Sequence, residues 1–268
     1  MDFRNIKLTL IPSPPDPRDW KVEKIYKAIR LPAELDYRNE MLSVRDQGSQ
    51  GSCAAMAAAA MKEWQERKDV GLEEYFSPQF IYNNRENPSS SGMYTRDVMR
   101  ILSDLGDCRE EMFTYGRTGK PPDAAYAEAR QYPIGNYAFV DTIEGLKTAL
   151  VENGPTLIAF PVYNFGGRFW KKEVGEWLLG YHMVLVVGYS DIKKNFIIRN
   201  SWGDDWAESG YTYFPYEDWG WQEEIATTVD TDSDNYIPPA PDNKSWFTKY
   251  WWIIAIVIAI GAALWIWG

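Results

Sequence analysis

Helical patterns occupy the first part of this chain and short apolar runs occupy the second, and this order restricts the possible folds more than any other feature. Three segments are rich in strong helix formers or show helical apolar spacing: residues 53–67, 95–105 and 142–153. Five later segments are β-branched or aromatic runs between turn residues: 156–162, 183–189, 195–199, 211–216 and 224–229. Helices followed by strands predict an α+β fold with two subdomains and a cleft between them.

The balance of charge argues against nucleic acid as a partner. The 268 residues include 28 Lys and Arg against 38 Asp and Glu, a formal net charge of −10. Binding to nucleic acid depends on counterion release by clustered Lys and Arg, and the sequence has no such cluster. The length suits one compact domain of about 200 residues with extensions, and it leaves the oligomeric state open.

Cysteine and histidine are rare, since Cys53, Cys108 and His182 are the only ones in the sequence. A disulfide-built extracellular domain normally carries more cysteines, and the N-terminus lacks the long apolar stretch of a secretory signal peptide. Both observations favour a reducing compartment. One histidine and two distant cysteines supply no metal site, and phosphate-loop signatures are absent, so no metal and no other cofactor is expected.

Extensions flank the globular body, which we expect at residues 31–229. The N-terminal lead, residues 1–30, contains the run IPSPPDP at positions 11–17. Four prolines in so short a span exclude a regular helix and favour an extended path. Residues 230–249 form an acidic, proline-containing linker that we expect to be extended and mobile.

The segment from Trp251 to Trp267 contains neither a charged residue nor a proline. A helix over these 17 residues would be roughly 26 Å long, the short end of what crosses a bilayer. Aromatic residues flank both ends, as in the aromatic belts of membrane spans. We predict a transmembrane tail anchor at residues 250–268, with a buried core helix as the alternative. Lys244 and Lys249 precede the anchor and no basic residue follows it, which favours a catalytic domain on the cytoplasmic side.

Cys53 follows a glycine-containing loop, residues 46–52, and begins the alanine-rich helical segment. A helix N-terminus carries unpaired amides and the positive end of the helix dipole, which favour a thiolate over a thiol. The thiolate is the form that attacks carbonyl carbon. Cys53 is therefore a candidate nucleophile, and the alternative from this segment alone is a small buried packing residue.

His182 stands at the start of an apolar strand, directly after Gly180 and Tyr181. Its ring could face a cleft, although a lone histidine is more often structural. Asn200 follows a later strand, and an asparagine carbonyl can accept the proton of one ring nitrogen and so aim the other nitrogen at sulfur. Trp202 can shield that hydrogen bond from water. A turn asparagine at a strand end is the alternative for Asn200.

Taken together, these segments resemble the papain family of cysteine peptidases. The resemblance rests on Gln47 six residues before Cys53, Gly-Ser-Cys at 51–53, the His-x-Val strand from His182 to Tyr189, and Asn-Ser-Trp-Gly at 200–203. It covers residues 31–229. It implies a papain-like fold with a helical left subdomain, an antiparallel β-barrel-like right subdomain and the active-site cleft between them.

The resemblance also implies roles for particular residues. Cys53 would be the nucleophile, His182 the general base and acid, and Asn200 the group that orients the histidine. The Gln47 side chain and the Cys53 backbone amide would form the oxyanion hole. Four further residues would bind substrate: Ser91, Gly92, Met93 and Trp202.

Three positions depart from the family pattern. Gln50 replaces the cysteine usually found three residues before the nucleophile, so the family's disulfide at this position cannot form. Ala54 replaces the usual aromatic residue, and Tyr181 precedes the histidine. The substitutions resemble a disulfide-poor microbial branch of the family. Within that branch Cys108 looks like a free packing thiol.

The leading interpretation is a membrane-tethered cysteine endopeptidase that forms and hydrolyses a thioester acyl-enzyme, with proteins or peptides as substrates. Two alternatives remain: a transpeptidase or amide hydrolase with the same chemistry, and a catalytically idle peptide-binding module. We also hypothesise that residues 8–20 of the lead lie extended across the cleft and restrain activity. A strap on the back of the domain is the alternative for this segment.

Overall fold

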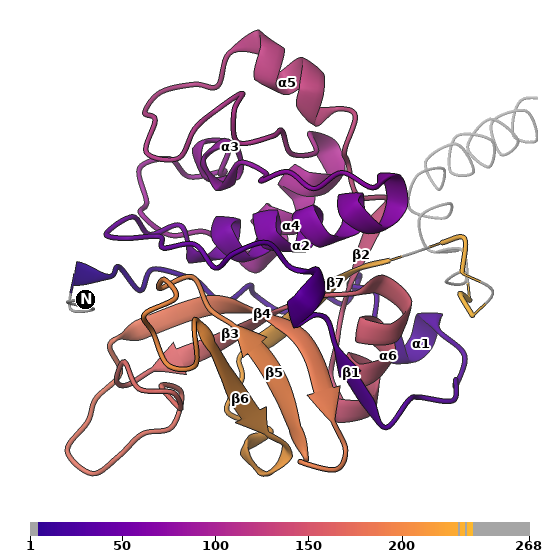
Figure 1. Cartoon of the computed structure of the whole chain (residues 1–268). Helices are drawn as coiled ribbons and strands as arrows, with labels where there is room; N and C mark the ends of the chain where they lie inside the picture. Colours follow the sequence, from indigo (N-terminus) through magenta and orange to yellow (C-terminus); the bar gives the residue numbers. More distant parts are fainter. Residues whose placement is uncertain (1–4, 230, 234, 238–268) are drawn as a thin grey trace, which may run out of the picture. The chain divides into compact units, whose positions relative to one another are not determined.

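The structure is a computed structural model, and it describes residues 5–229, 231–233 and 235–237. Its helices are α1 (Val22–Ile25), α2 (Cys53–Val70), α3 (Pro78–Asn83), α4 (Thr95–Asp104), α5 (Asp123–Ala129) and α6 (Ile143–Asn153). Its strands are β1 (Glu34–Asp36), β2 (Asn136–Phe139), β3 (Thr156–Val162), β4 (Gly180–Ser190), β5 (Asn195–Arg199), β6 (Tyr211–Pro215) and β7 (Glu224–Val229). Figure 1 shows α2 to α5 gathered in one half and most of the sheet, with α6, in the other, which confirms the α+β prediction.

The strands form one antiparallel sheet in the order β2-β7-β3-β4-β5-β6, with β1 paired to β4 outside this path. Strands β2 and β6 stand at the two ends of the order and do not pair in the described residues. The sheet of the described residues is therefore open, whereas the family resemblance implied a barrel-like subdomain. The long pair β3–β4 is central, and its register sets Phe160 opposite His182.

Helix α2 belongs to the helical half and contacts the sheet as well as α3 and α4. Five of its six alanines are buried, with Ala60 partly buried, and the helix contacts both β3 and β4. Small side chains allow this close approach, because each alanine adds a single methyl group to the helix surface. The helix continues to Val70, beyond the Arg67 boundary read from the sequence, and Gly71 ends it in the left-handed conformation at φ 71°.

Both faces of strand β3 are buried, because each packs against its own apolar cluster. Leu157 and Ala159 belong to the cluster beneath α2, while Ile158 and Phe160 point into the cluster on the other face. Ring centroids of Phe160 and Trp170 lie 4.9 Å apart in a stacked arrangement. Burial on both faces explains why residues 156–162 form a continuous apolar run.

The compact unit extends to Ile237, past the boundary at Val229 that the sequence suggested. The amide of Lys27 donates to the carbonyl of Asn235 at 2.9 Å, and the amide of Ile237 donates to the carbonyl of Ile25 at 2.6 Å. The start of the predicted linker therefore pairs with the end of the lead.

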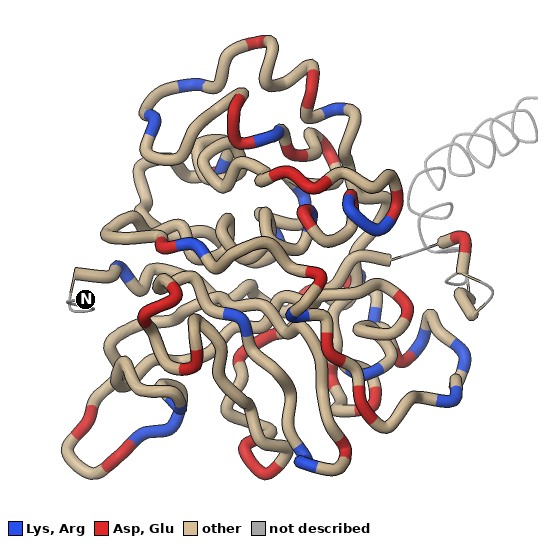
Figure 2. Tube along the Cα trace, viewed as in Figure 1, with Lys and Arg blue, Asp and Glu red and all other residues tan. Residues whose placement is uncertain are grey.

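Acidic and basic residues are interspersed over both halves of the unit (Figure 2).

Within the described part of the chain, the structure contains no helix with the length and apolar character needed to span a bilayer. The predicted tail anchor at residues 250–268 lies outside the described residues.

Candidate active site

Cys53 is the first residue of α2 and only 1% exposed. Hydrogen bonds from the backbone amides of Met183, Ala54 and Leu10 reach its thiol, so β4, α2 and the N-terminal lead meet at this sulfur. Met183 directly follows His182 along β4. The fold thus brings the candidate nucleophile to the beginning of the strand that carries the candidate base.

His182 is fully buried and is held from two sides. Its Nε2 lies 2.7 Å from Oδ1 of Asn200, and the same oxygen accepts the backbone N–H of Ser201 at 2.7 Å. The ring of Trp202 stacks on the imidazole, with centroids 4.6 Å apart and planes at 26°. Nδ1 has no hydrogen-bond partner among the described residues. The bond on Nε2 therefore fixes the ring while leaving the other nitrogen available for proton transfer.

Gln47 lies in the loop before α2, and its side chain is 1% exposed. Its Oε1 accepts the hydroxyl of Ser201 at 2.9 Å, and its Nε2 donates to the carbonyl of Gln50 at 3.1 Å. Its backbone amide donates to the carbonyl of Ser201 at 2.9 Å. Because an amide nitrogen carries two hydrogens, one N–H of Gln47 remains for a further acceptor.

The segment Ser91–Met93 contacts the lead, with Gly92 and Met93 buried and Ser91 still exposed. Thr9 donates its hydroxyl to the carbonyl of Ser91 at 2.9 Å, and the amide of Ile11 donates to the carbonyl of Met93 at 3.0 Å. A Cβ on Gly92 would lie 1.8 Å from the carbonyl oxygen of Thr9, so only glycine allows this approach. The predicted substrate-binding segment is occupied by residues 9–11.

A family model described as papain family cysteine protease matches residues 31–229. This chain belongs to the papain family of cysteine proteases. It is accordingly a hydrolase of the cysteine peptidase type.

Individual relatives of this papain-family protease come from several kinds of organism. An uncharacterized peptidase C1-like protein of Acanthamoeba polyphaga mimivirus is 30% identical over 253 residues, covering 77% of this chain and 80% of the relative. Cathepsin K of Mus musculus is 30% identical over 204 residues, covering 68% of this chain and 59% of the relative. The crystal structure of xylellain, a cysteine protease from Xylella fastidiosa, has a TM-score of 0.73 at 31% identity and covers 84% of this chain and 97% of its own.

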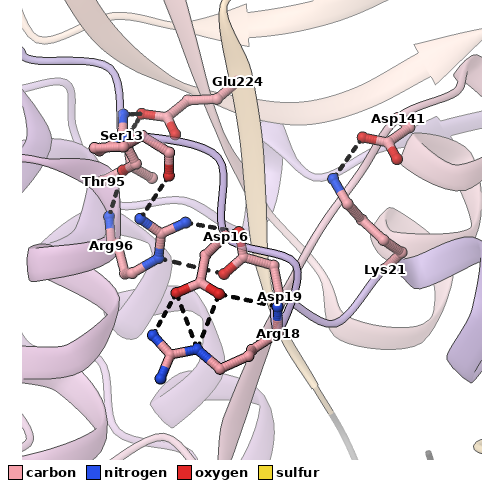
Figure 3. Close-up of polar contacts among 10 residues, drawn as sticks. Ser13, Asp16, Arg18, Asp19, Lys21, Thr95, Arg96, Asp141 and Glu224 are labelled. Carbon is pink, nitrogen blue, oxygen red and sulfur yellow. Dashed lines mark hydrogen bonds and ion pairs between the residues drawn. The ribbon is translucent and has the colours of Figure 1, made fainter.

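Residues 9–11 of the lead pair on one side with Tyr181 of β4 and on the other with the segment 91–94, and the following residues make polar contacts. The amide of Leu10 donates to the carbonyl of Tyr181 at 3.3 Å, immediately before His182. Figure 3 shows the next contacts, in which Glu224 accepts the amide of Ser13 at 3.1 Å and Arg96 binds Asp19 at 2.6 Å. Residues 8–11 thus lie against the Cys53 thiol and the strand residue before His182, while residues 13–19 are held by polar contacts to β7 and α4.

Burial shifts the pKa of both candidate catalytic groups. Desolvation raises the pKa of Cys53 to about 11, against the amide hydrogen bonds that favour the thiolate. Desolvation also lowers the pKa of His182 to about 4, against the bond from Asn200 that favours the protonated ring. The covered site therefore holds a neutral thiol and a neutral imidazole at neutral pH.

Several residues at the site escaped the sequence analysis. Ser201 lies next to Asn200 in the Asn-Ser-Trp-Gly motif, and this position was the signal that could have identified it. Its hydroxyl donates a hydrogen bond to Oε1 of Gln47. Glu224 begins β7 and Arg96 is the second residue of α4, and neither carries a local signal that predicts its contact with the lead. Cys108 is free and buried in a separate small cluster with Phe80 and Phe113. Among the described residues, no group of three or more His, Cys, Asp or Glu side chains is placed to hold a metal ion.

Proposed function

We propose that this papain-family protease hydrolyses internal peptide bonds of proteins or peptides through Cys53, His182, Asn200 and Gln47. The observation that carries the proposal is the 2.7 Å contact between His182 Nε2 and Asn200 Oδ1. Met183, the next residue after His182, places its backbone amide at the Cys53 thiol. An imidazole oriented by a buried partner and placed at a sulfur nucleophile is the arrangement needed for covalent acyl transfer.

In the proposed reaction, His182 accepts the proton of Cys53 as the sulfur bonds to the scissile carbonyl carbon. The carbonyl oxygen becomes an oxyanion that accepts hydrogen bonds from the Gln47 side chain and the Cys53 amide. The C–N bond then breaks, His182 gives its proton to the leaving amine, and a thioester remains. Water attacks the thioester, loses a proton to His182 and releases the acid, while the thiol regains that proton.

An epoxide inhibitor of papain-like enzymes tests this assignment by intact-protein mass. We expect one adduct on the full chain, none on Cys53→Ala and slow formation on His182→Ala. The Cys53→Ala variant also controls for reaction at Cys108. No adduct on a protein whose lead has been displaced would favour the idle peptide-binding module. Turnover only with added amine acceptors would favour the transpeptidase.

We further propose that the lead is an intramolecular inhibitor of this protease. Three observations support the proposal: Leu10 is only 4% exposed, its amide reaches both Tyr181 and the Cys53 thiol, and Thr9 and Ile11 bond to Ser91 and Met93. A peptide substrate needs the same carbonyl and amide groups. The lead must therefore move, or be cut, before a substrate can enter.

We also propose that residues 250–268 anchor the protease in a membrane, with its catalytic domain on the cytoplasmic side, and that the chain belongs to the disulfide-poor microbial branch. The uncharged segment 251–267 and its flanking aromatic residues support the anchor. Gln50 in place of a cysteine and the free thiols support the branch. Carbonate-washed membranes should retain the full chain but lose a chain ending at Asn243, and equal retention of both would refute the anchor.

A further inference from the structure

The loop from Gln47 to Ser52 must hold two groups at once for the proposed chemistry. Gln47 supplies the side-chain amide at one end, and Ser52 leads into the backbone amide of Cys53 at the other. Gln50 stands within the loop where the family resemblance leads us to expect a disulfide-bonded cysteine. The described structure therefore has to fix this loop by noncovalent contacts.

A single hydroxyl group contacts both ends of the loop. Tyr115, in the connection between α4 and α5, donates its hydroxyl to the carbonyl of Gln47 at 2.8 Å. The hydroxyl of Ser52 lies 2.5 Å from the same Tyr115 oxygen. A phenol has one hydrogen and a carbonyl can only accept, so Ser52 must donate to Tyr115. The order Ser52 to Tyr115 to Gln47 is thus fixed by chemistry.

The hydrogen bond between Ser52 and Tyr115 changes how the N-terminus of α2 is capped. Ser52 is the N-cap residue of α2, a position where a serine hydroxyl usually accepts a backbone amide of the first turn. Here its side chain makes no capping hydrogen bond. The hydroxyl faces Tyr115 instead, so the contact with Tyr115 replaces the cap.

Tyr115 is itself well anchored. Its amide donates to Oε1 of Glu110 at 2.7 Å, and the amide of the following Gly116 donates to Oε1 of Gln79 at 2.8 Å. The guanidinium of Arg45 lies 5.9 Å from its ring centroid. Burial raises the pKa of Tyr115 to about 12, so its hydroxyl keeps its hydrogen throughout the neutral range. A donor anchored in this way can hold the loop without changing its protonation.

We propose that Tyr115 is a positioning residue for the oxyanion hole, which it keeps in shape by joining the Gln47 carbonyl to the Ser52 hydroxyl across the loop. The inference rests on the proposed roles of Gln47 and Cys53. In this inference a single side chain holds the loop in place, where the family resemblance leads us to expect a disulfide. Tyr115 touches neither the nucleophile nor substrate in this account, and acts only through the loop.

The test compares Tyr115→Phe with the parent, both as full chains, because this change removes the hydroxyl and keeps the ring. We expect kcat on a peptide substrate to fall about tenfold, less than the 10²–10³-fold loss on deleting an oxyanion donor. KM should stay within about twofold, since the lead competes with substrate equally in both proteins. The matched control is Tyr126→Phe, which removes a hydroxyl that donates to Oδ1 of Asn84 at 2.7 Å and makes no hydrogen bond to Gln47 or Ser52.

Two reagents separate positioning from general damage. A peptide aldehyde forms a tetrahedral adduct with an oxyanion, and its affinity should fall about tenfold in Tyr115→Phe. Iodoacetamide reacts at saturated carbon without an oxyanion, and its rate on Cys53 should stay within about twofold. Thermal unfolding should show that Tyr115→Phe and Tyr126→Phe remain folded.

Unchanged kcat and unchanged aldehyde affinity in Tyr115→Phe would overturn the inference, as would an equal loss of aldehyde affinity and iodoacetamide rate. If Tyr115→Phe does not fold, Ser52→Ala removes one of the two bonds and is judged by the same pair of reagents. A parent chain that neither turns over peptide nor forms an epoxide adduct after its lead is displaced would instead overturn the proposed function.

Discussion

Two parts of the lead are held by different forces. Residues 8–11 bond to the cleft through backbone groups, and Leu10 is buried there, while residues 13–19 are held mainly by polar and charged side chains at the rim. Apolar burial and neutral hydrogen bonds respond little to salt, whereas partly exposed ion pairs are screened by it. We therefore expect the contacts of residues 8–11 to supply most of the free energy that holds the lead in place, and the contacts of residues 13–19 to supply a smaller, salt-dependent part.

The largest change is expected from Leu10→Asp, which breaks the cleft contacts. A carboxylate buried beside Cys53 without a partner is strongly unfavourable, so the lead should leave the cleft. We expect kcat/KM on a small peptide to rise by about 10²-fold, since each 1.4 kcal/mol lost from the cover is about tenfold in its equilibrium constant. Lys7→Asp is the control, because it adds a carboxylate at an exposed position of the lead just before residues 8–11. Equal rates in both variants would contradict the comparison.

A smaller change is expected in the pH dependence of alkylation at Cys53. In the full chain the raised pKa of about 11 means that the iodoacetamide rate should keep rising as the pH approaches that value. The thiol has a higher pKa with the lead bound than with the lead displaced. The resulting stabilisation of the lead-bound state is therefore complete below the pKa of the open state and is lost as the pH rises through the pKa of the lead-bound state.

The same measurement on Leu10→Asp sharpens this expectation. Once the lead leaves, water and a protonated His182 can stabilise the thiolate, so the profile should move to lower pH. The readout is the mass of the modified protein at each pH, with Cys53→Ala reporting any reaction at Cys108. Superimposable profiles for the two proteins would mean that the lead does not control the ionisation of Cys53.

The smallest effect is expected from Arg96→Ala, which removes the ion pair with Asp19 at the rim. The two side chains are 24% and 13% exposed, and a pair of this kind contributes about 1 kcal/mol or less. We expect kcat/KM to rise about threefold to fivefold at low salt, with the difference from the parent shrinking at high salt.

Lys21→Ala provides the matched control for the rim contacts. Lys21 binds Asp141 at 2.7 Å with side chains 29% and 59% exposed, outside the cleft segment (Figure 3). Its removal should leave kcat/KM unchanged. An effect of Arg96→Ala as large as that of Leu10→Asp would reverse the ranking of the two parts of the lead.

The sequence predicted the longer elements and missed the short ones. Residues 156–162, 195–199 and 224–229 are strands with the bounds expected, because each is an apolar run between turn residues. Helix α3 was missed because six residues hold too few apolar repeats to reveal a period. Ser77 and Pro78 did carry a start signal, since Ser77 caps the helix with Pro78 in its first turn. Strand β1 has only three residues, and its pairing with β4 decides its conformation.

By itself, the sequence determined the family, the α+β order and the residues proposed for catalysis. These features are local: Asn200, Ser201 and Trp202 are consecutive, and Cys53 follows directly from its loop. Tertiary structure alone decided that Tyr115 joins Ser52, 63 positions away, and that Thr9 bonds to Ser91, 82 positions away. No helical or strand period relates such residues, because a single hydrogen bond between distant segments exists only after the two subdomains and the lead have packed together.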